Sequence, residues 1–484
     1  MTTLIAVDLG NESGRVMRVT FDGRRISSSE VYRFANHPVT VNGTLHWDVL
    51  RLWHEVQAGL AQALREPADG IAVDSFGVDF GLLDARGHLI GNPVHMRDGR
   101  TEGVMDQVLQ IIPRETLFER SGGIGFYVIN TLYQLVAIKR DAPWQLEAAR
   151  TLLTMPNLMN YWLTGERLSE FTHSTTTQCY NPLARDWDRS TLDALGIPTV
   201  MFPPIVQPGE RIGAYQGIPV YAVASHDTGS AVVAVPAETP RYAYISSGTW
   251  SLFGIETRQP LLNRAALNAN LTSEGGAFGT YRPLKLVMGL WILQQCRAAW
   301  SAQGLDTDYG RLLAEADAAP PFAALIDPDD ASFFPPGDMP ERVRAFCGRT
   351  GQPLPETPGQ ITRCVLESLA LKYRVVLEQL ITAGQQAVDV LHIVGGGSRN
   401  PLLCQMTADA TQRPVLAGPE EATALGNGLV QLIARGELRD LAEARRVVRD
   451  SLPPTRYTPR DTAAWETAYA RFQGIMTSIE KSQL

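Results

Sequence analysis

The sequence predicts an α/β protein built from two halves of related design. At 484 residues the chain is too long for one ordinary hydrophobic core. Strand-like and helical stretches follow one another in a similar order in both halves, and glycine-containing turns follow several of the strand-like stretches. Alternating strands and helices are typical of α/β folds, which bind ligands beyond the ends of their strands.

The first half has three strand-like stretches, a helical stretch and a further strand. Residues 4–7 and 16–21 are apolar and flank a turn at 8–15, and a second hairpin turn leads into a third strand. Apolar residues then recur at helical spacing over 50–64, and 71–84 is rich in strand-forming residues. This βββαβ order is that of an actin-like (ribonuclease H-like) domain.

The second half repeats this design. Its expected strands are 242–246, 250–256 and 388–394, and its expected helices are 285–300, 361–383 and 401–411. We therefore expect two actin-like domains with a catalytic cleft between them. The expected boundaries are 1–238 for the N-terminal domain, 239–452 for the C-terminal domain and 453–484 for a tail.

Composition restricts the possible partners. The net charge is −8 without a block of Lys or Arg, which argues against nucleic acid or an anionic membrane as a partner. The N-terminus lacks a basic segment and no apolar run reaches the roughly 18 residues of a membrane span, so neither a signal peptide nor a span is expected. The five cysteines lack CxxC spacing and favour free thiols in a reducing cytoplasm. Whether Cys347 and Cys364 meet stays open, as does the choice between a monomer and a homodimer.

Asp227 lies where an apolar stretch ends and a small-residue helical stretch begins. A carboxylate at such a junction faces the open end of a sheet, and the N–H groups of the helix start favour anions. The simpler interpretation is a helix N-cap, a position that Asp also favours. The neighbouring His226 offers a ring nitrogen to a ligand, with a buried core histidine as its alternative.

Three turns have the composition of phosphate-binding loops. Residues 8–15 (DLGNESGR) combine glycines with a hydroxyl and with the guanidinium of Arg15. Residues 246–251 (SSGTWS) and 395–400 (GGGSRN) offer hydroxyls and glycine amides. Each turn taken alone is also typical of an ordinary hairpin or loop. Neither a Walker nor a Rossmann fingerprint occurs, which disfavours the two commonest nucleotide-binding folds.

Asp8 ends a strand in the same half as Asp227. Mg²⁺ prefers one or two carboxylates together with phosphate oxygens, so these two aspartates are the candidate metal ligands. We interpret the pattern as a site for a triphosphate with Mg²⁺, in which Asp227 acts as the base towards an acceptor alcohol. Such phosphoryl transfer depends mainly on positioning and charge neutralisation.

In this order the motifs resemble the FGGY family of carbohydrate kinases. The resemblance rests on 8–15, 225–228 (SHDT), 246–251 and 395–398 (GGGS). Further runs resemble the branch of the family that acts on L-rhamnulose, namely 77–80 (GVDF), 97–101 (RDGRT), 130–135 (NTLYQL), 175–178 (TTTQ) and 288–291 (MGLW).

The resemblance implies phosphate transfer from ATP, with Mg²⁺, to a deoxy-ketose, converting L-rhamnulose to L-rhamnulose 1-phosphate. It implies that Asp227 is the general base and that Gly77, His226 and Thr228 border the sugar. The implied ATP contacts are Asn11, Glu12, Ser13, Gly14, Arg15, Thr249, Gln294 and Gly396. Another ketose (L-fuculose, L-xylulose or L-ribulose) is the first alternative, and an actin-like ATPase without a sugar substrate is the second.

Overall fold

The computed structural model describes residues 1–483, which form two compact units. The first unit contains Met1–Glu238, Glu256–Leu284 and Glu421–Pro453, and the second contains Thr239–Ile255, Lys285–Glu420 and the chain from Pro454 onward. The domain boundaries expected at 238/239 and 452/453 divide the chain by its order along the sequence, and they stay a prediction. Packing groups the chain differently, because two later segments return to the first unit.

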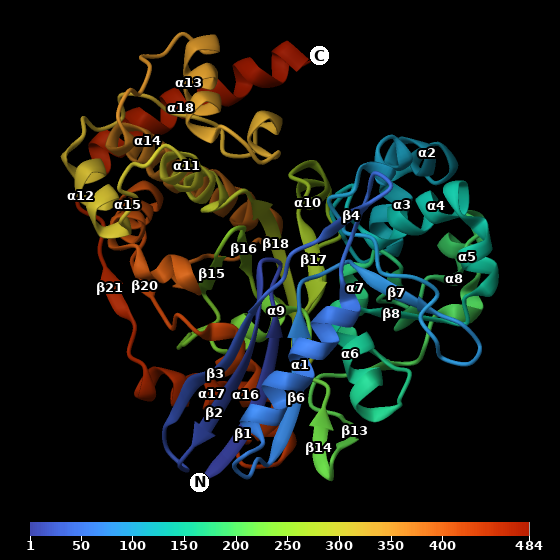
Figure 1. Ribbon diagram of the computed structural model, residues 1–484. Helices are drawn as coiled ribbons and strands as arrows, with labels where there is room; N and C mark the ends of the chain where they lie inside the picture. Colours follow the sequence, from blue (N-terminus) through green and yellow to red (C-terminus); the bar gives the residue numbers. More distant parts are fainter. Residues whose placement is uncertain (484) are drawn as a thin grey trace. The chain divides into compact units, whose positions relative to one another are not determined.

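A mixed six-stranded sheet organises the first unit in the order β13-β14-β6-β1-β2-β3. Its strands are β1 (Thr2–Leu9), β2 (Ser13–Phe21), β3 (Ile26–Ala35), β6 (Gly70–Ser75), β13 (Arg211–Tyr215) and β14 (Ile218–Tyr221). Helix α1 (Val49–Ala63) packs on β2 and β3, and α16 (Ala422–Ala434) packs on β1 and β6 (Figure 1). All residues of β1 after Thr2 are buried, so both faces of the sheet are covered there. The succession β1, β2, β3, α1 and β6 confirms the predicted βββαβ order.

The remaining elements of the first unit are helices and short strands outside this sheet. The helices are α2 (Val104–Ile111), α3 (Arg114–Arg120), α4 (Thr131–Asp141), α5 (Pro143–Ala148), α6 (Met155–Thr164), α7 (Phe171–Thr176), α8 (Arg189–Ala194), α9 (Asp227–Val233), α10 (Arg264–Asn268) and α17 (Leu441–Ser451). The short strands are β4 (Val39–Val41), β5 (Thr44–His46), β7 (Phe80–Leu83), β8 (Thr151–Thr154), β9 (Ser169–Glu170), β10 (Tyr180–Asn181), β11 (Asp186–Trp187), β12 (Ile205–Val206) and β17 (Thr272–Gly275).

The strand-rich stretch at 71–84 is two strands, where the sequence suggested one region. β6 ends at Ser75, and β7 pairs with β8 outside the six-stranded sheet. Val78 lies between them with φ 68°, a left-handed conformation that β-branched residues rarely adopt. The Thr131 hydroxyl donates to the Val78 carbonyl at 2.5 Å, and the buried Asp79 carboxylate accepts from Trp47 Nε1 at 2.6 Å. These long-range contacts hold the turn that carries Gly77.

The second unit contains five neighbouring strands in the order β16-β15-β19-β20-β21. They are β15 (Tyr242–Ser247), β16 (Ser251–Ile255), β19 (Val390–Val394), β20 (Val415–Ala417) and β21 (Thr455–Tyr457). The helices are α11 (Trp291–Ala302), α12 (Tyr309–Ala318), α13 (Met339–Arg349), α14 (Pro358–Gly384), α15 (Pro401–Thr411) and α18 (Thr462–Gln483). The helix predicted at 285–300 starts only at Trp291, because residues 285–287 still belong to β18 (Tyr281–Val287), which pairs with β17.

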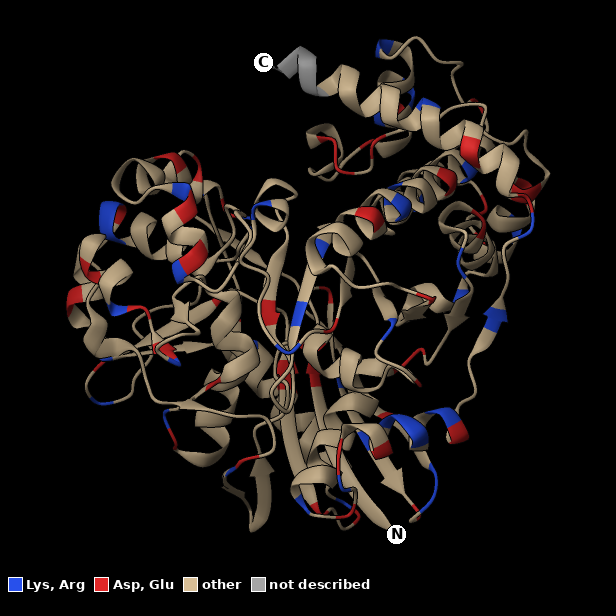
Figure 2. Cartoon of the chain, turned by 180° about the vertical axis from the view of Figure 1, so that it is seen from behind, with Lys and Arg blue, Asp and Glu red and all other residues tan. Residues whose placement is uncertain are grey.

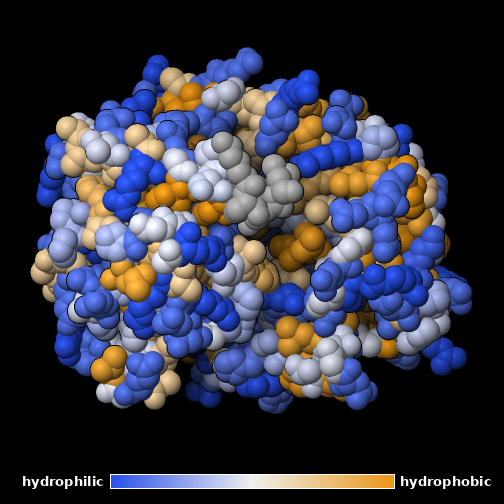
Figure 3. All heavy atoms as spheres, turned by 90° about the horizontal axis from the view of Figure 1, so that it is seen from above, coloured by the Kyte–Doolittle hydropathy of each residue, from blue (hydrophilic) through white to orange (hydrophobic). Residues whose placement is uncertain are grey.

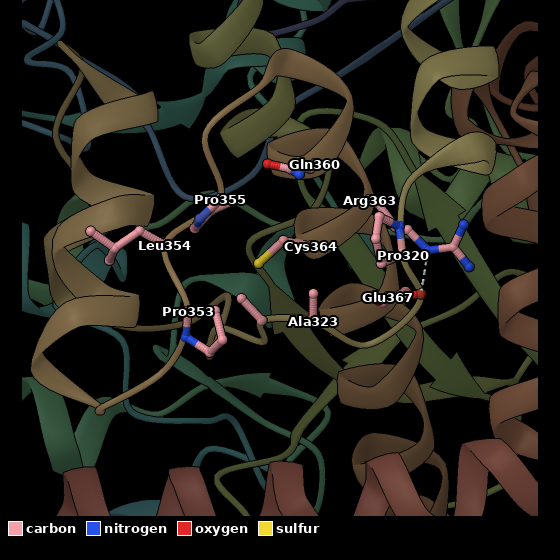
Figure 4. Close-up of a pocket in the computed structure, with 10 residues that line it drawn as sticks. Pro320, Ala323, Pro353, Leu354, Pro355, Gln360, Arg363, Cys364 and Glu367 are labelled. Carbon is pink, nitrogen blue, oxygen red and sulfur yellow. Dashed lines mark hydrogen bonds and ion pairs between the residues drawn. The ribbon is translucent and has the colours of Figure 1, made fainter.

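All five cysteines are buried and free. The Cys347 thiol raises the pKa of the Cys364 thiol well above its usual value, and burial adds to this, so α13 and α14 bring the two thiols close together. Cys364 also lines a cavity of about 110 Å³ in the second unit (Figure 4). The other lining residues are Pro320, Ala323, Ala324, Pro353, Leu354, Pro355, Gln360, Arg363 and Glu367. This set contains none of the predicted site residues.

Charged and apolar side chains are mixed on the surface. Figure 2 shows acidic residues beside basic ones along α14 and α17. On the face seen in Figure 3, hydrophobic patches are separated by hydrophilic side chains. Within residues 1–483, no helix combines the length and the apolar character that crossing a bilayer requires.

Candidate active site

Asp8 lies near the end of β1, in parallel register with Asp74 of β6. The Asp8 carboxylate accepts a hydrogen bond from Arg15 at 2.5 Å, and the same guanidinium donates to Glu421 at 2.5 Å. Asp74 is fully buried and accepts from Asn427 Nδ2 at 2.6 Å. The Arg15 guanidinium, which we expected to bind an anion, is thus already paired with two carboxylates of the first unit.

Burial changes the pKa of two aspartates at this end of the sheet. It raises the pKa of Asp74 well above the usual range, and the neighbouring charge of Asp8 adds to this. Burial also raises the pKa of Asp227, an effect that His226 opposes and Asp8 reinforces. The Asp227 side chain is 28% exposed, whereas that of Asp8 is 8% exposed. Asp227 is therefore the more accessible carboxylate, and its raised pKa makes it a stronger base.

Asp227 is the first residue of α9 and does not occupy the N-cap, which is His226. Its Oδ1 accepts from the backbone N–H of Thr228 at 2.5 Å. The segment just before the helix is fixed by Glu170, a buried carboxylate that accepts from the Ser225 hydroxyl at 2.6 Å and the Ser225 N–H at 3.1 Å. The loop that presents Asp227 is therefore anchored by a side chain that sequence reasoning did not single out.

The turn around Gly77 lies against the same loop. His173 of α7 donates from Nε2 to the Phe76 carbonyl at 2.9 Å. A Cβ atom placed on Gly77 would lie 3.3 Å from Nε2 of His226. The structure thus brings Gly77, His226, Asp227 and Thr228 together in the first unit.

The buried His173 gives this region a pH-dependent stability. Burial lowers the pKa of His173 to about 3, compared with about 6.5 for an unfolded histidine. The unfolded chain therefore binds more protons between these values, and the contribution of His173 is complete above about pH 6.5 and is lost as the pH falls towards about 3. Its slope reaches at most about 1.4 kcal/mol per pH unit.

We expect His173→Gln to reduce this acid sensitivity, because the Gln amide can donate to the Phe76 carbonyl without titrating. The measurement is the free energy of unfolding in urea from about pH 7 to about pH 5. The wild type should lose stability relative to the variant as the pH falls, and the comparison cancels the other titrating groups. Parallel pH profiles would contradict this expectation.

The predicted nucleotide-binding turn at residues 11–15 is braced from within the first unit. Asn36 donates its backbone N–H to the Glu12 carbonyl at 2.9 Å and its Nδ2 to the Gly10 carbonyl at 2.8 Å. Oδ1 of Asn11 is buried and has no hydrogen-bond partner among the described residues. Ser13 and Gly14 begin β2, and Arg15 follows them. All five predicted contacts of this turn therefore adjoin Asp8.

In the second unit, the two other glycine turns lie at the ends of neighbouring strands. β15 and β19 are parallel, with Ser246 opposite Val394, so the turns after them emerge at the same edge. Gly395 has φ 81°, and a Cβ atom on it would come within 3.0 Å of the Ser247 carbonyl oxygen. Only glycine permits this positive φ and close backbone approach without strain.

Thr249, Gln294 and Gly396 adjoin these two turns. The Thr249 carbonyl accepts from the N–H of Trp291, which joins its turn to the start of α11. Gln294 lies in the first turn of that helix, and its Oε1 is buried without a partner among residues 1–483. Gly396 is exposed, and a Cβ on it would contact nothing within 4 Å. The three predicted ATP contacts of this unit thus come from adjoining segments.

The aspartates fit Mg²⁺ in part. Among the described residues, no group of three or more His, Cys, Asp or Glu side chains is arranged to hold a metal ion. Mg²⁺ is commonly held by only one or two carboxylates, with substrate phosphates and water supplying the other ligands. Asp8 and Asp227 interact electrostatically and provide oxygen donors of this kind. The donor chemistry therefore suits a Mg²⁺ ion that arrives with a nucleotide.

Comparison with known proteins defines the class of this chain. Residues 3–228 match the N-terminal domain, and residues 243–435 the C-terminal domain, of the FGGY family of carbohydrate kinases. The chain belongs to this family, which confirms the resemblance seen in its motifs.

Two relatives carry the comparison further. The chain is 42% identical to the rhamnulokinase of Bacteroides thetaiotaomicron, over 97% of this chain and 99% of the relative. It is also 42% identical to the rhamnulokinase of Pectobacterium atrosepticum, over 98% of this chain and 96% of the relative.

Solved structures share the fold at much lower sequence identity. The ligand-bound xylulose kinase of Lactobacillus acidophilus matches with a TM-score of 0.82 at 16% identity, covering 99% of both chains. The glycerol kinase of Plasmodium falciparum, solved with ADP, matches with a TM-score of 0.76 at 13% identity, covering 100% of this chain and 99% of that chain. These matches confirm the predicted α/β fold of two domains.

Proposed function

We propose that this protein phosphorylates L-rhamnulose, with ATP as the phosphate donor and L-rhamnulose 1-phosphate as the product. The observation that carries the proposal is the 42% identity to rhamnulokinases over nearly the whole of both chains. The arrangement in the first unit supports it, because an accessible carboxylate of raised pKa adjoins Gly77, His226 and Thr228.

In this proposal Asp227 takes the proton of the attacking 1-hydroxyl as general base. Gly77, His226 and Thr228 border the sugar. The ATP contacts are Asn11, Glu12, Ser13, Gly14, Arg15, Thr249, Gln294 and Gly396. The buried Asn11 and Gln294 side-chain oxygens, which have no partner within the described chain, support their assignment to a polar ligand.

Asp8 and Asp227 would hold Mg²⁺. The ion, when bound with ATP, supplies charge neutralisation for the phosphate oxygens. The pairing of Arg15 with Asp8 orients the carboxylate before a ligand arrives. We retain the cytoplasm as the expected compartment and a monomer or homodimer as the expected state.

A panel of ketoses tests the proposal. ADP release is measured with L-rhamnulose, L-fuculose, L-xylulose and L-ribulose, and the phosphate position of the product is determined by ³¹P NMR. We expect the highest kcat/KM with L-rhamnulose and a phosphate on its 1-hydroxyl. Similar values for all four sugars would overturn the proposed specificity. ATP hydrolysis that does not depend on any sugar would favour the actin-like ATPase instead.

A further inference from the structure

The β17–β18 hairpin contributes two charged side chains to the surroundings of His226. Glu274 and Arg282 are register partners across this hairpin. Glu274 lies 2.9 Å from Nδ1 of His226, and Nη2 of Arg282 lies 3.1 Å from the same carboxylate oxygen. Glu274 and Arg282 are buried, and both belong to the first unit together with His226. Buried charges are costly unless they are paired, so this geometry is strongly determined.

The contact with Glu274 places a proton on Nδ1 of His226. Burial acts to raise the pKa of Glu274, but His226 and Arg282 outweigh it and hold that pKa below its usual value. An ionised carboxylate only accepts hydrogen bonds, so Nδ1 at 2.9 Å must be the donor. Nη2 of Arg282 also lies 3.2 Å from Nδ1, but its own acceptor is Glu274. Donation from Arg282 to Nδ1 would leave two lone pairs opposed across the shorter 2.9 Å contact.

The other nitrogen, Nε2, faces the predicted sugar site. It lies 3.6 Å from Oδ1 of Asp227 and would lie 3.3 Å from a Cβ atom on Gly77. The His173 ring is the further titratable group beside it, with ring centroids 6.0 Å apart. With Nδ1 bound to Glu274, Nε2 is the ring nitrogen that is left to hydrogen-bond a ligand.

We infer that Glu274 is a positioning residue that holds His226 through its Nδ1–H, so that Nε2 is presented to a hydroxyl of the ketose and hydrogen-bonds it. Arg282 balances the buried carboxylate and holds it in place. The inference rests on the proposed function, since it names how that site binds its sugar. It adds the segment 272–284 to the sugar site, which the sequence motifs place only at 77 and 226–228.

The proton on Nδ1 can be observed without any turnover. In ¹⁵N-labelled protein, long-range ¹H–¹⁵N NMR should show a protonated Nδ1 for His226, assigned by comparison with His226→Gln. In Glu274→Ala the Nδ1–H signal should shift, because its acceptor is gone. An unprotonated Nδ1 in the wild type would overturn the inference.

Sugar kinetics give a second, independent measurement. Glu274→Ala should raise the KM for L-rhamnulose about tenfold, the size of one hydrogen bond, and leave the KM for ATP unchanged. Glu274→Gln keeps an acceptor oxygen and should restore most of the affinity. The matched control is Glu367→Gln, which removes a buried carboxylate paired with Arg363 at 2.7 Å in the second unit and should not change the KM for the sugar.

Substitutions of His226 test the roles of its two ring nitrogens separately. The amide of Gln reaches the place of Nε2, whereas the amide of Asn reaches only that of Nδ1. We expect His226→Gln to keep a lower KM for L-rhamnulose than His226→Asn, and Glu274→Ala to add nothing in the His226→Asn background. The reverse order, or additive effects in the double variant, would overturn the inference.

These outcomes separate the inference from the proposed function. A wild type that shows a protonated Nδ1 but does not phosphorylate L-rhamnulose refutes the proposed function and leaves the role of Glu274 in orienting His226 intact. A wild type that phosphorylates L-rhamnulose, with a Glu274→Ala variant of unchanged KM, supports the function and refutes the inference.

Discussion

We expect the replacement of Asp227 by Asn to lower kcat for L-rhamnulose by about 10²–10⁴-fold, the usual contribution of a general base. Asn has the same size and can keep the hydrogen bond from the Thr228 N–H at the start of α9, but it cannot take a proton. Folding should be normal, because the side chain is partly exposed. The measurement is kcat together with sugar binding by calorimetry, which should persist.

The matched control is Asp106→Asn, an exposed acid in the first turn of α2 in the same unit. Turnover of Asp227→Asn at the wild-type rate would remove Asp227 from catalysis. Residual activity is expected in any case. Mutual positioning of two reactants contributes roughly 7–11 kcal/mol to such reactions, more than the base itself.

Gly426→Ala should destabilise the first unit by about 3 kcal/mol, at the upper end of what overpacking costs. A Cβ atom on Gly426 of α16 would lie 1.8 Å from the Ser230 carbonyl oxygen of α9. A backbone atom cannot move aside as a flexible side chain can, so the two helices must separate. The measurement is the free energy of unfolding in urea.

The same change should lower kcat, because α9 begins with Asp227 and must shift when the helices separate. Gly474→Ala is the control. Gly474 also lies in a helix, α18, but a Cβ there meets nothing within 4 Å, so alanine should be neutral or slightly stabilising. Equal stability of the two alanine variants would show that α16 and α9 can adjust without cost.

Much of the site could be predicted because local patterns carry it. Asp8, Asp227 and the glycine turns each lie at the end of a strand or the start of a helix, and a chain shows such junctions in its hydrophobic pattern. The strand predicted over 71–84 was too long because the break at Val78 depends on Thr131 and Trp47, which are distant in sequence. Helix α11 starts later than predicted because β18 extends to Val287.

The side chains that sequence reasoning missed act through tertiary contacts. Asp74 is one acid within an apolar strand, and only the parallel register of β6 with β1 places it beside Asp8. Glu170 looks like a helix cap, which it is, yet it also holds Ser225 from 55 residues away. Glu274 and Arg282 lie in a hairpin with no motif of its own. Neither spacing nor composition indicates such partners.

The first unit is built from early and late segments of the chain, which has a consequence for its folding during synthesis on the ribosome. Its central strand, β1, is made first, but α16, which covers β1 and β6, ends at Ala434. Asn427 and Gln431 of that helix donate to Asp74 and to the Ile5 carbonyl, so polar groups at the centre of the sheet lack these partners until translation is nearly complete. A nascent chain that ends at residue 238 lacks α16, so the apolar face of β1 and β6 that this helix covers would be exposed. We expect such a chain to bind chaperones.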